Sequence, residues 1–136
     1  MKVVLGSNVF ISAFASRGLC VEILRICIAN HDLILSEHLL HEIQRGFGRK
    51  LKMPGEACEQ NIRIIRALSR MEIPADVPRD SCRDPKDLPV LGLVSASRAD
   101  YLVSGDGDLL SLKKYKGCMI LSPRSFFPIL KEGKGP

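Results

Sequence analysis

Short apolar runs, each closed by a small polar residue, recur along the chain and predict the strands of a buried sheet. The clear runs cover residues 3–5, 33–35, 101–103 and 119–121, and a weaker one lies near 71–73. They are continuous rather than alternating, which is typical of parallel strands covered by helices on both faces. A serine follows each clear run, directly or after Gly6, and suits a strand-to-helix turn or a helix N-cap.

Apolar residues at helical spacing fill the gaps between these runs. We expect helices over residues 8–15, 21–29, 37–50, 56–70, 89–99 and 122–130. The helix over 37–50 is amphipathic, and its polar face holds His38 and His41. This alternation predicts an α/β protein, a three-layer α/β/α sandwich with a central, mostly parallel sheet. We expect one domain over residues 1–130 and a tail over 131–136.

Composition narrows the class of protein. The 136 residues contain no apolar run of membrane-spanning length, and the first strand is too short for a secretory signal, so we expect a cytoplasmic protein. Five cysteines without a CxxC pair argue against a zinc site or disulfides and favour small core residues. The net charge of +5 favours nucleic acid or an acidic protein as partner, although ordinary solubilising charge also explains it. The absence of Trp argues against a base-stacking platform.

Acidic residues follow the apolar runs or lie in the segments between them. Ligands of parallel sheets bind outside the carboxyl ends of the strands, where the strand order reverses. Ser7, Ser104 and Asp106 follow such runs, and we expect the proline-rich loop over 74–87 to cover the same edge. The carboxylates expected near this edge are those of Glu42, Asp84, Asp87, Asp106 and Asp108.

A cluster of carboxylates indicates a metal site, because several such groups stay ionised in one cleft only with a cation. Mg²⁺ and Mn²⁺ prefer oxygen ligands, and either can activate water for phosphodiester hydrolysis. Each acid also has a structural interpretation. Asp84 and Asp106 suit turns, Asp87 and Asp108 suit helix N-caps, and Glu42 suits a solvated helix face.

Other polar residues near the expected edge have open roles. Ser7 and Asn8 close the first strand, where a hydroxyl can hold a metal-bound water or cap a helix. If Asp108 is a cap, its helix covers 109–112. His38 and His41 lie beside Glu42, a spacing that suggests zinc, but they fall on a polar face away from the other acids, so we expect solvated histidines.

These segments, in this order, resemble the PIN domain family, in the branch assigned to toxins of toxin–antitoxin pairs. The resemblance lies in VVLGSNV at 3–9, LSEHLLHEI at 35–43, DPKD at 84–87, ADYLVSGDGDLL at 99–110 and SPRSF at 122–126. It implies an α/β/α sandwich and, for many members, a ribonuclease that depends on Mg²⁺ or Mn²⁺. It also implies RNA, a cognate antitoxin protein and a second copy of the chain as partners.

Site residues are carried over by position. The resemblance implies Glu42, Asp87 and Asp106 as catalytic and metal-binding acids, with Gly6 at the position of a fourth acid and Ser7 and Asn8 as neighbours. From their places in the chain we also expect Asp108 as a further metal ligand and Asp84 and Ser104 as neighbours. Gly6 departs from the family pattern, because the first strand normally supplies an aspartate there. Its lost carboxylate predicts weaker metal binding and weakened or lost cleavage.

Three functions remain open at this point. The first is a PIN-type ribonuclease, weakened or intact. The second is a non-catalytic RNA- or protein-binding module on the same fold, and the third is a metal-dependent phosphoesterase acting on small molecules. For an RNA substrate, the residues expected to neutralise phosphates are Arg45, Arg49, Lys50, Arg83 and Lys86.

Overall fold

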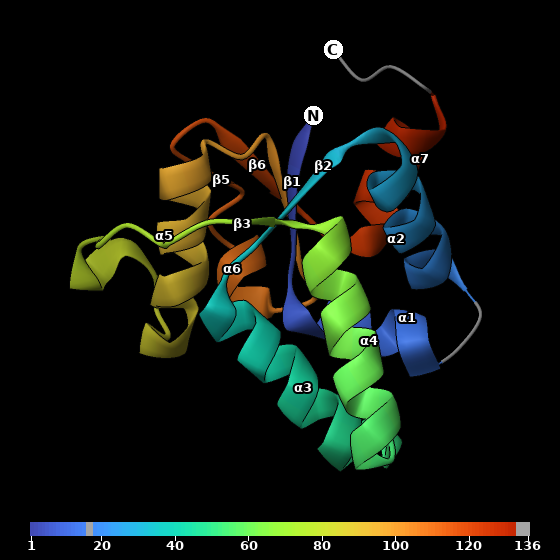
Figure 1. Ribbon diagram of the computed structural model, residues 1–136. Helices are drawn as coiled ribbons and strands as arrows, with labels where there is room; N and C mark the ends of the chain where they lie inside the picture. Colours follow the sequence, from blue (N-terminus) through green and yellow to red (C-terminus); the bar gives the residue numbers. More distant parts are fainter. Residues whose placement is uncertain (16–17, 133–136) are drawn as a thin grey trace.

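A six-stranded sheet forms the centre of the protein (Figure 1). The computed structural model describes residues 1–15 and 18–132. The strands are β1 (Lys2–Leu5), β2 (Asp32–Leu35), β3 (Arg70–Met71), β4 (Tyr101–Val103), β5 (Lys114–Tyr115) and β6 (Cys118–Leu121). They lie in the order β3-β2-β1-β4-β6-β5, and every neighbouring pair is parallel except β5 with β6. The predicted parallel sheet is confirmed; β5 was not predicted, because its two residues form no apolar run.

Helices cover both faces of this sheet. The longer ones are α1 (Ser7–Ala15), α2 (Leu19–Asn30), α3 (Glu37–Leu51), α4 (Gly55–Leu68), α5 (Leu88–Ser97) and α7 (Pro123–Lys131). The short ones are the 3₁₀ turns η1 (Arg79–Ser81) and η2 (Pro85–Asp87) and the single turn α6 (Gly107–Leu110). In Figure 1, α5 lies on one side of the sheet and α1, α2 and α7 lie on the other. The predicted three-layer α/β/α sandwich is therefore confirmed.

Most predicted boundaries differ from the observed ones by one or two residues. The helix predicted over 56–70 ends at Leu68, because Arg70 already belongs to β3. The last helix continues to Lys131, inside the segment expected to be a tail, and residues 133–136 lie outside the described part of the chain. Across residues 1–15 and 18–132, the helices are too short or too polar for a membrane crossing.

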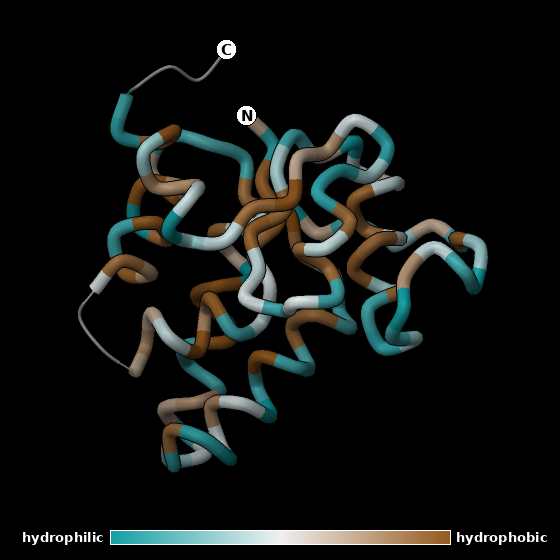
Figure 2. Tube along the Cα trace, turned by 180° about the vertical axis from the view of Figure 1, so that it is seen from behind, coloured by the Kyte–Doolittle hydropathy of each residue, from teal (hydrophilic) through white to brown (hydrophobic). Residues whose placement is uncertain are grey.

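The core consists of the predicted apolar runs and the inner faces of the helices. Val3, Val4 and Leu5 are fully buried, and Figure 2 shows hydrophobic residues concentrated along the central strands. Helices α1 and α3 touch at Gly46, where a Cβ atom would lie 2.1 Å from Cδ1 of Ile11. Four cysteines are buried and Cys20 is half-buried, and all five are free, as predicted.

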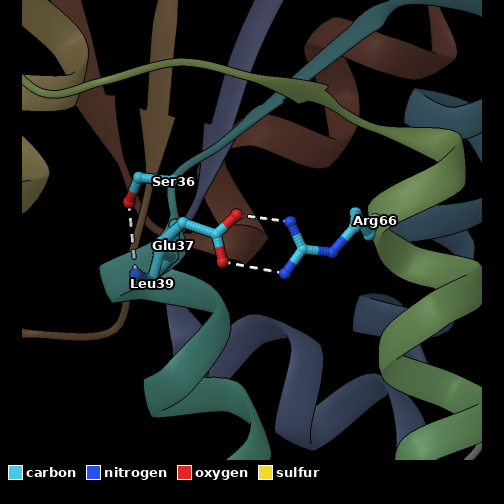
Figure 3. Close-up of polar contacts among 4 residues, drawn as sticks. All are labelled: Ser36, Glu37, Leu39 and Arg66. Atoms are coloured by element: carbon cyan, nitrogen blue, oxygen red, sulfur yellow. Dashed lines mark hydrogen bonds and ion pairs between the residues drawn. The ribbon is translucent and has the colours of Figure 1, made fainter.

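Two contacts hold the first turn of helix α3 in place, a cap and an ion pair. Ser36 caps it, since its Oγ accepts a hydrogen bond of 3.2 Å from the Leu39 amide (Figure 3). Glu37 forms a two-pronged ion pair with Arg66 of α4, which lowers the pKa of the Glu37 carboxyl (Figure 3). These contacts hold α3, and with it Glu42, at the carboxyl edge of the sheet.

Candidate metal centre

The strand order reverses between β1 and β4. The chain passes from β1 to β2 on one side, and β4 later pairs with the other side of β1. Leu5 lies beside Val103 in this pair, and the Gly6 amide donates a 2.8 Å hydrogen bond to the Val103 carbonyl. Gly6 and Ser104 are therefore neighbours at the carboxyl edge, at the switch point where such sheets bind ligands.

A pocket of about 330 Å³ opens at this edge. Its walls come from the first turns of α1 and α3, from η2, and from the segment after β4. Among the residues predicted for the site or its neighbourhood, the walls include Gly6, Ser7, Asn8, Glu42, Asp84, Asp87, Ser104 and Asp106. Asp108 does not line the pocket, but one of its carboxylate oxygens lies within 4.8 Å of oxygens of Asp84 and Asp87.

Glu42 enters the pocket from α3 together with a histidine. His38 lies one turn earlier, and its Nε2 is 3.6 Å from Oε2 of Glu42. His38 is exposed, as predicted, but it lines the same pocket as Asp84 and Asp87, so the predicted separation of His38 from the other acids is wrong. Residues four apart share one side of a helix, and His38 therefore reaches the pocket together with Glu42. His41 is exposed and is not among the lining residues, as expected for a solvated histidine.

Asp106 follows β4 in a turn that its own backbone and side chain stabilise. Its amide donates to Oγ of Ser104 at 3.0 Å, and its Oδ1 accepts from the Asp108 amide at 3.2 Å. Asp106 is thus the N-cap of α6, which begins at Gly107. The alternative that Asp108 caps a helix over 109–112 is wrong, since Asp108 lies in the first turn of the helix.

Asp84 and Asp87 come from the η2 turn. Oδ1 of Asp84 accepts a 3.0 Å hydrogen bond from the Lys86 amide, which confirms its role in a turn. Asp87 occupies the N-cap position of α5, but its side chain makes no capping hydrogen bond. Its Oδ2 is buried and has no hydrogen-bond partner among the described residues. A buried carboxylate oxygen without a donor lacks compensation for its lost hydration.

The carboxylates gather closely enough to share one cation. One oxygen from each of Asp84, Asp87 and Asp108 lies within 4.8 Å of the other two. Burial, and after it the adjacent Asp106 and the charges of Asp84 and Asp108, together raise the pKa of Asp87 to about 7. The partnerless oxygen and the all-oxygen donor set fit a hard divalent cation such as Mg²⁺ or Mn²⁺.

A groove of about 910 Å³ adjoins the pocket on the side of α3. The two hollows share Ser7, Asn8, His38, Glu42 and Lys86 as lining residues. The groove also exposes cations from α3: its walls include Arg45, Arg49 and Lys50, and Nζ of Lys50 donates to Oδ1 of Asn8 at 3.3 Å. Four of the five predicted phosphate-binding cations line this groove; Arg83 lines neither hollow.

Gly6 leaves room for a side chain at the switch point. A Cβ atom there would lie 3.4 Å from the Val103 carbonyl oxygen and 3.6 Å from Oγ of Ser104, which is ordinary van der Waals contact. Its backbone is outside the left-handed region that requires glycine. The fold therefore does not demand glycine at the position where the resemblance implies an aspartate.

Two features of the site were missed from the sequence. The spacing of His38 and Glu42 was a usable signal, because four residues place two side chains on one side of a helix. No comparable signal identified the grouping of Asp84 with Asp108, which depends on how η2 packs beside α6.

Comparison with known proteins agrees with this geometry. The fold is similar to that of a crystal structure of VapBC2 from Rickettsia felis bound to a DNA fragment from its promoter, with 16% sequence identity and a TM-score of 0.62. That match covers 90% of this chain and 98% of the other. The structure of PAE2754 from Pyrobaculum aerophilum is similar at 14% identity and a TM-score of 0.63, with 97% and 90% covered. No curated protein gives a match.

A family match covers most of the chain. The family model described as PIN domain matches residues 2–108, which include β1 to β4 and every acid of the cluster. The sheet topology, the acids at its switch point and this match agree, and the chain belongs to the PIN domain family.

Proposed function

We propose that the chain is a Mg²⁺- or Mn²⁺-dependent ribonuclease of PIN type and the toxin of a toxin–antitoxin pair, with cleavage weakened or lost at Gly6. One observation carries this proposal: Glu42, Asp87 and Asp106 line one pocket at the switch point, and a groove with cationic walls adjoins that pocket. Such an arrangement suits a substrate with a phosphodiester backbone, because the cations neutralise phosphates while the acids hold a metal.

We assign different ligand oxygens of the cation to different acids. Asp87 supplies the buried oxygen that has no hydrogen-bond partner among the described residues, and Asp106, whose Oδ1 accepts from the Asp108 amide, lies against the Asp87 carboxyl. Glu42 faces them across the pocket from α3. When bound, the cation lowers the pKa of a water molecule and stabilises the charge that develops on the phosphate. Arg45, Arg49 and Lys50, all on α3, neutralise phosphates of the strand in the groove beside the pocket.

Gly6 weakens this site on its β1 side. The pocket has one carboxylate fewer than the family pattern implies, so the cation loses both a ligand and a negative charge. The remaining acids lie mainly on η2, on α6 and at the end of β4, which leaves Glu42 at a distance from the tight trio of Asp84, Asp87 and Asp108. We expect lower metal affinity and, with it, slower cleavage.

The partners follow from the same proposal. The similar Rickettsia felis structure is a VapBC2 complex bound to promoter DNA, and we infer an antitoxin protein as partner for this chain too. RNA is the inferred substrate, and a homodimer is the inferred state of the free protein.

Cleavage of RNA by four purified forms tests the enzyme proposal. The forms are the natural chain, Gly6→Asp, the uncharged control Gly6→Asn, and Gly6→Asp combined with Asp106→Asn. We expect Mn²⁺-dependent cleavage by Gly6→Asp, little or none by the natural chain and by Gly6→Asn, and none by the double variant. Cleavage by the natural chain that chelation stops would show that the remaining acids suffice. If no form cleaves RNA under any divalent metal, the enzyme proposal is wrong.

A non-catalytic RNA-binding module is the second candidate, and Gly6 is the observation that favours it. An enzyme needs the cation, whereas a module needs only the groove with Arg45, Arg49 and Lys50. RNA binding that is unchanged by a chelator, together with the absence of cleavage in the Gly6→Asp form, would support the module. In both cases RNA binding should weaken steeply with added salt.

A further inference from the structure

We infer that a second copy of this chain docks along the outer edge of β3, related to the first by a two-fold axis near Met71. The inference rests on the homodimer proposed above and names its surface. It does not depend on metal binding or on cleavage. Three observations carry it: exposed apolar side chains on both sides of β3 along the chain, an open strand edge and a self-complementary charge pattern.

Exposed apolar side chains lie on both sides of β3 along the chain, at the end of α4 and two residues after the strand. Five large apolar side chains are exposed in the described part of the chain, and three of them fall within residues 64–73. Ile64, Leu68 and Ile73 expose 54%, 49% and 87% of their surface. Single exposed apolar residues need no explanation, but Ile64 and Leu68 are one turn apart and share one side of α4.

The outer edge of β3 is open. β3 ends the sheet, and Figure 1 shows it in front of β2 with no described strand beyond it. The amide of Glu72 points inward, since it donates a 2.8 Å hydrogen bond to the Leu35 carbonyl. Backbone groups alternate in direction along an extended strand, so those of Met71 point to the open side. Unpaired edge groups of this kind are a template for pairing with another chain.

The charges on this edge complement a second copy of themselves. Arg70 and Glu72 flank Met71, and within one chain Nε of Arg70 lies 3.7 Å from Oε1 of Glu72. If two copies run antiparallel about Met71, Arg70 of each faces Glu72 of the other. Directly opposite residues lie on the same face of a sheet, so both oppositely charged pairs form at once. The same register brings Ile73 of one copy beside Ser69 of the other, next to the exposed Leu68.

The other edge of the sheet has the opposite character. β5 and its turns carry Lys113, Lys114 and Lys116, and all three are exposed. A row of like charges repels a second copy and is a common protection of edge strands. Of the two sheet edges, the β3 edge is the one whose charges attract an identical partner.

Charge-swap variants test this surface, with molecular mass measured by light scattering over a range of protein concentrations. The natural chain should show twice the 15.0 kDa of one chain. Arg70→Glu makes the edge wholly acidic and Glu72→Arg makes it wholly basic, so each variant alone should self-associate about tenfold more weakly or worse. Mixing the two variants should restore a dimer, because one edge now complements the other. Glu22→Arg removes a similar exposed pair with Arg25 on α2 and should leave the mass unchanged.

The outcomes separate the surface from the rest of the proposed function. A monomeric natural chain at every concentration would overturn both the homodimer and this surface. A dimer that both single variants retain would leave the homodimer standing and overturn the β3 edge as its site. The same holds if the mixture stays monomeric although thermal unfolding shows both variants folded. Loss of the dimer in the single variants and its return in the mixture would establish the edge, whatever the cleavage assay gives.

Discussion

Asp87→Asn should stabilise the metal-free protein near neutral and alkaline pH. Burial and the neighbouring acids raise the pKa of Asp87 from 3.8 to about 7, so the folded protein keeps a proton that the unfolded chain releases. The free energy of unfolding therefore falls as the pH rises from about 4 to about 7, and this loss persists at higher pH. Asparagine is uncharged and nearly isosteric, and it removes no capping hydrogen bond, because the Asp87 side chain makes none.

The size of this effect follows from the same values. One pKa unit corresponds to about 1.4 kcal/mol, so a rise from 3.8 to about 7 gives an upper bound of about 4 kcal/mol. Asp87 is only partly buried and its pocket opens to solvent, which screens the charges, so we expect about 1–2 kcal/mol. For a chain of this size that is a rise of about 3–8 °C in melting temperature.

Thermal unfolding in a chelator, at about pH 8 and at about pH 5, measures the effect. At about pH 8 the variant should melt higher than the natural chain. At about pH 5 the difference should be smaller, because the folded state then keeps the proton on Asp87, and it should vanish only below about pH 4, where the unfolded chain is protonated as well. Added Mn²⁺ should reverse the order, since a ligand at 100 times its Kd stabilises the natural chain by about 2.7 kcal/mol and the variant lacks a ligand oxygen. A variant that melts lower at about pH 8 without metal would refute the argument that uncompensated charge destabilises this pocket.

Four further predictions concern the scaffold and the groove. Gly6→Ala should raise the free energy of unfolding by about 0.4–1 kcal/mol, because its Cβ has ordinary contacts. Gly92→Ala should lower the free energy of unfolding by about 1–3 kcal/mol, since its Cβ would lie 2.3 Å from the Ala75 carbonyl oxygen. Equal melting temperatures for the Gly6→Ala and Gly92→Ala variants would contradict the packing described. Ser36→Ala removes the cap of α3 and should cost about 1 kcal/mol in chemical denaturation, and an unchanged midpoint would show that the cap is dispensable. Arg49→Ala should reduce the slope of log RNA affinity against log salt by about 1, as measured by fluorescence anisotropy, whereas Arg25→Ala on α2, outside the groove, should leave it unchanged.

The sequence carried enough information for the sheet but not for every detail of the site. Continuous apolar runs predicted β1, β2, β4 and β6, because burial on both faces leaves a strong local signal. β5 left no such signal, since its two residues pair across a tight turn.

Within the site, strand ends were predictable and loop packing was not. Asp106 could be placed because it follows a buried strand, and Glu42 because its helix has a clear apolar face. The cap of α6 was assigned to the wrong aspartate, since the two candidates are two residues apart and the start of the helix decides between them. The approach of Asp84 to Asp108 depends on tertiary packing between η2 and α6, which no local pattern encodes.

Because the acidic pocket and the cationic groove share a wall, we expect the proposed metal and RNA ligands to be thermodynamically coupled. Glu42 and Lys86 line both hollows, so a divalent cation in one changes the electrostatic potential felt by a phosphate in the other. A metal that neutralises the acids therefore strengthens RNA binding, and by linkage RNA strengthens metal binding by the same factor. A site weakened by Gly6 can thus hold its metal poorly in the free protein and more tightly once a nucleic acid strand occupies the groove.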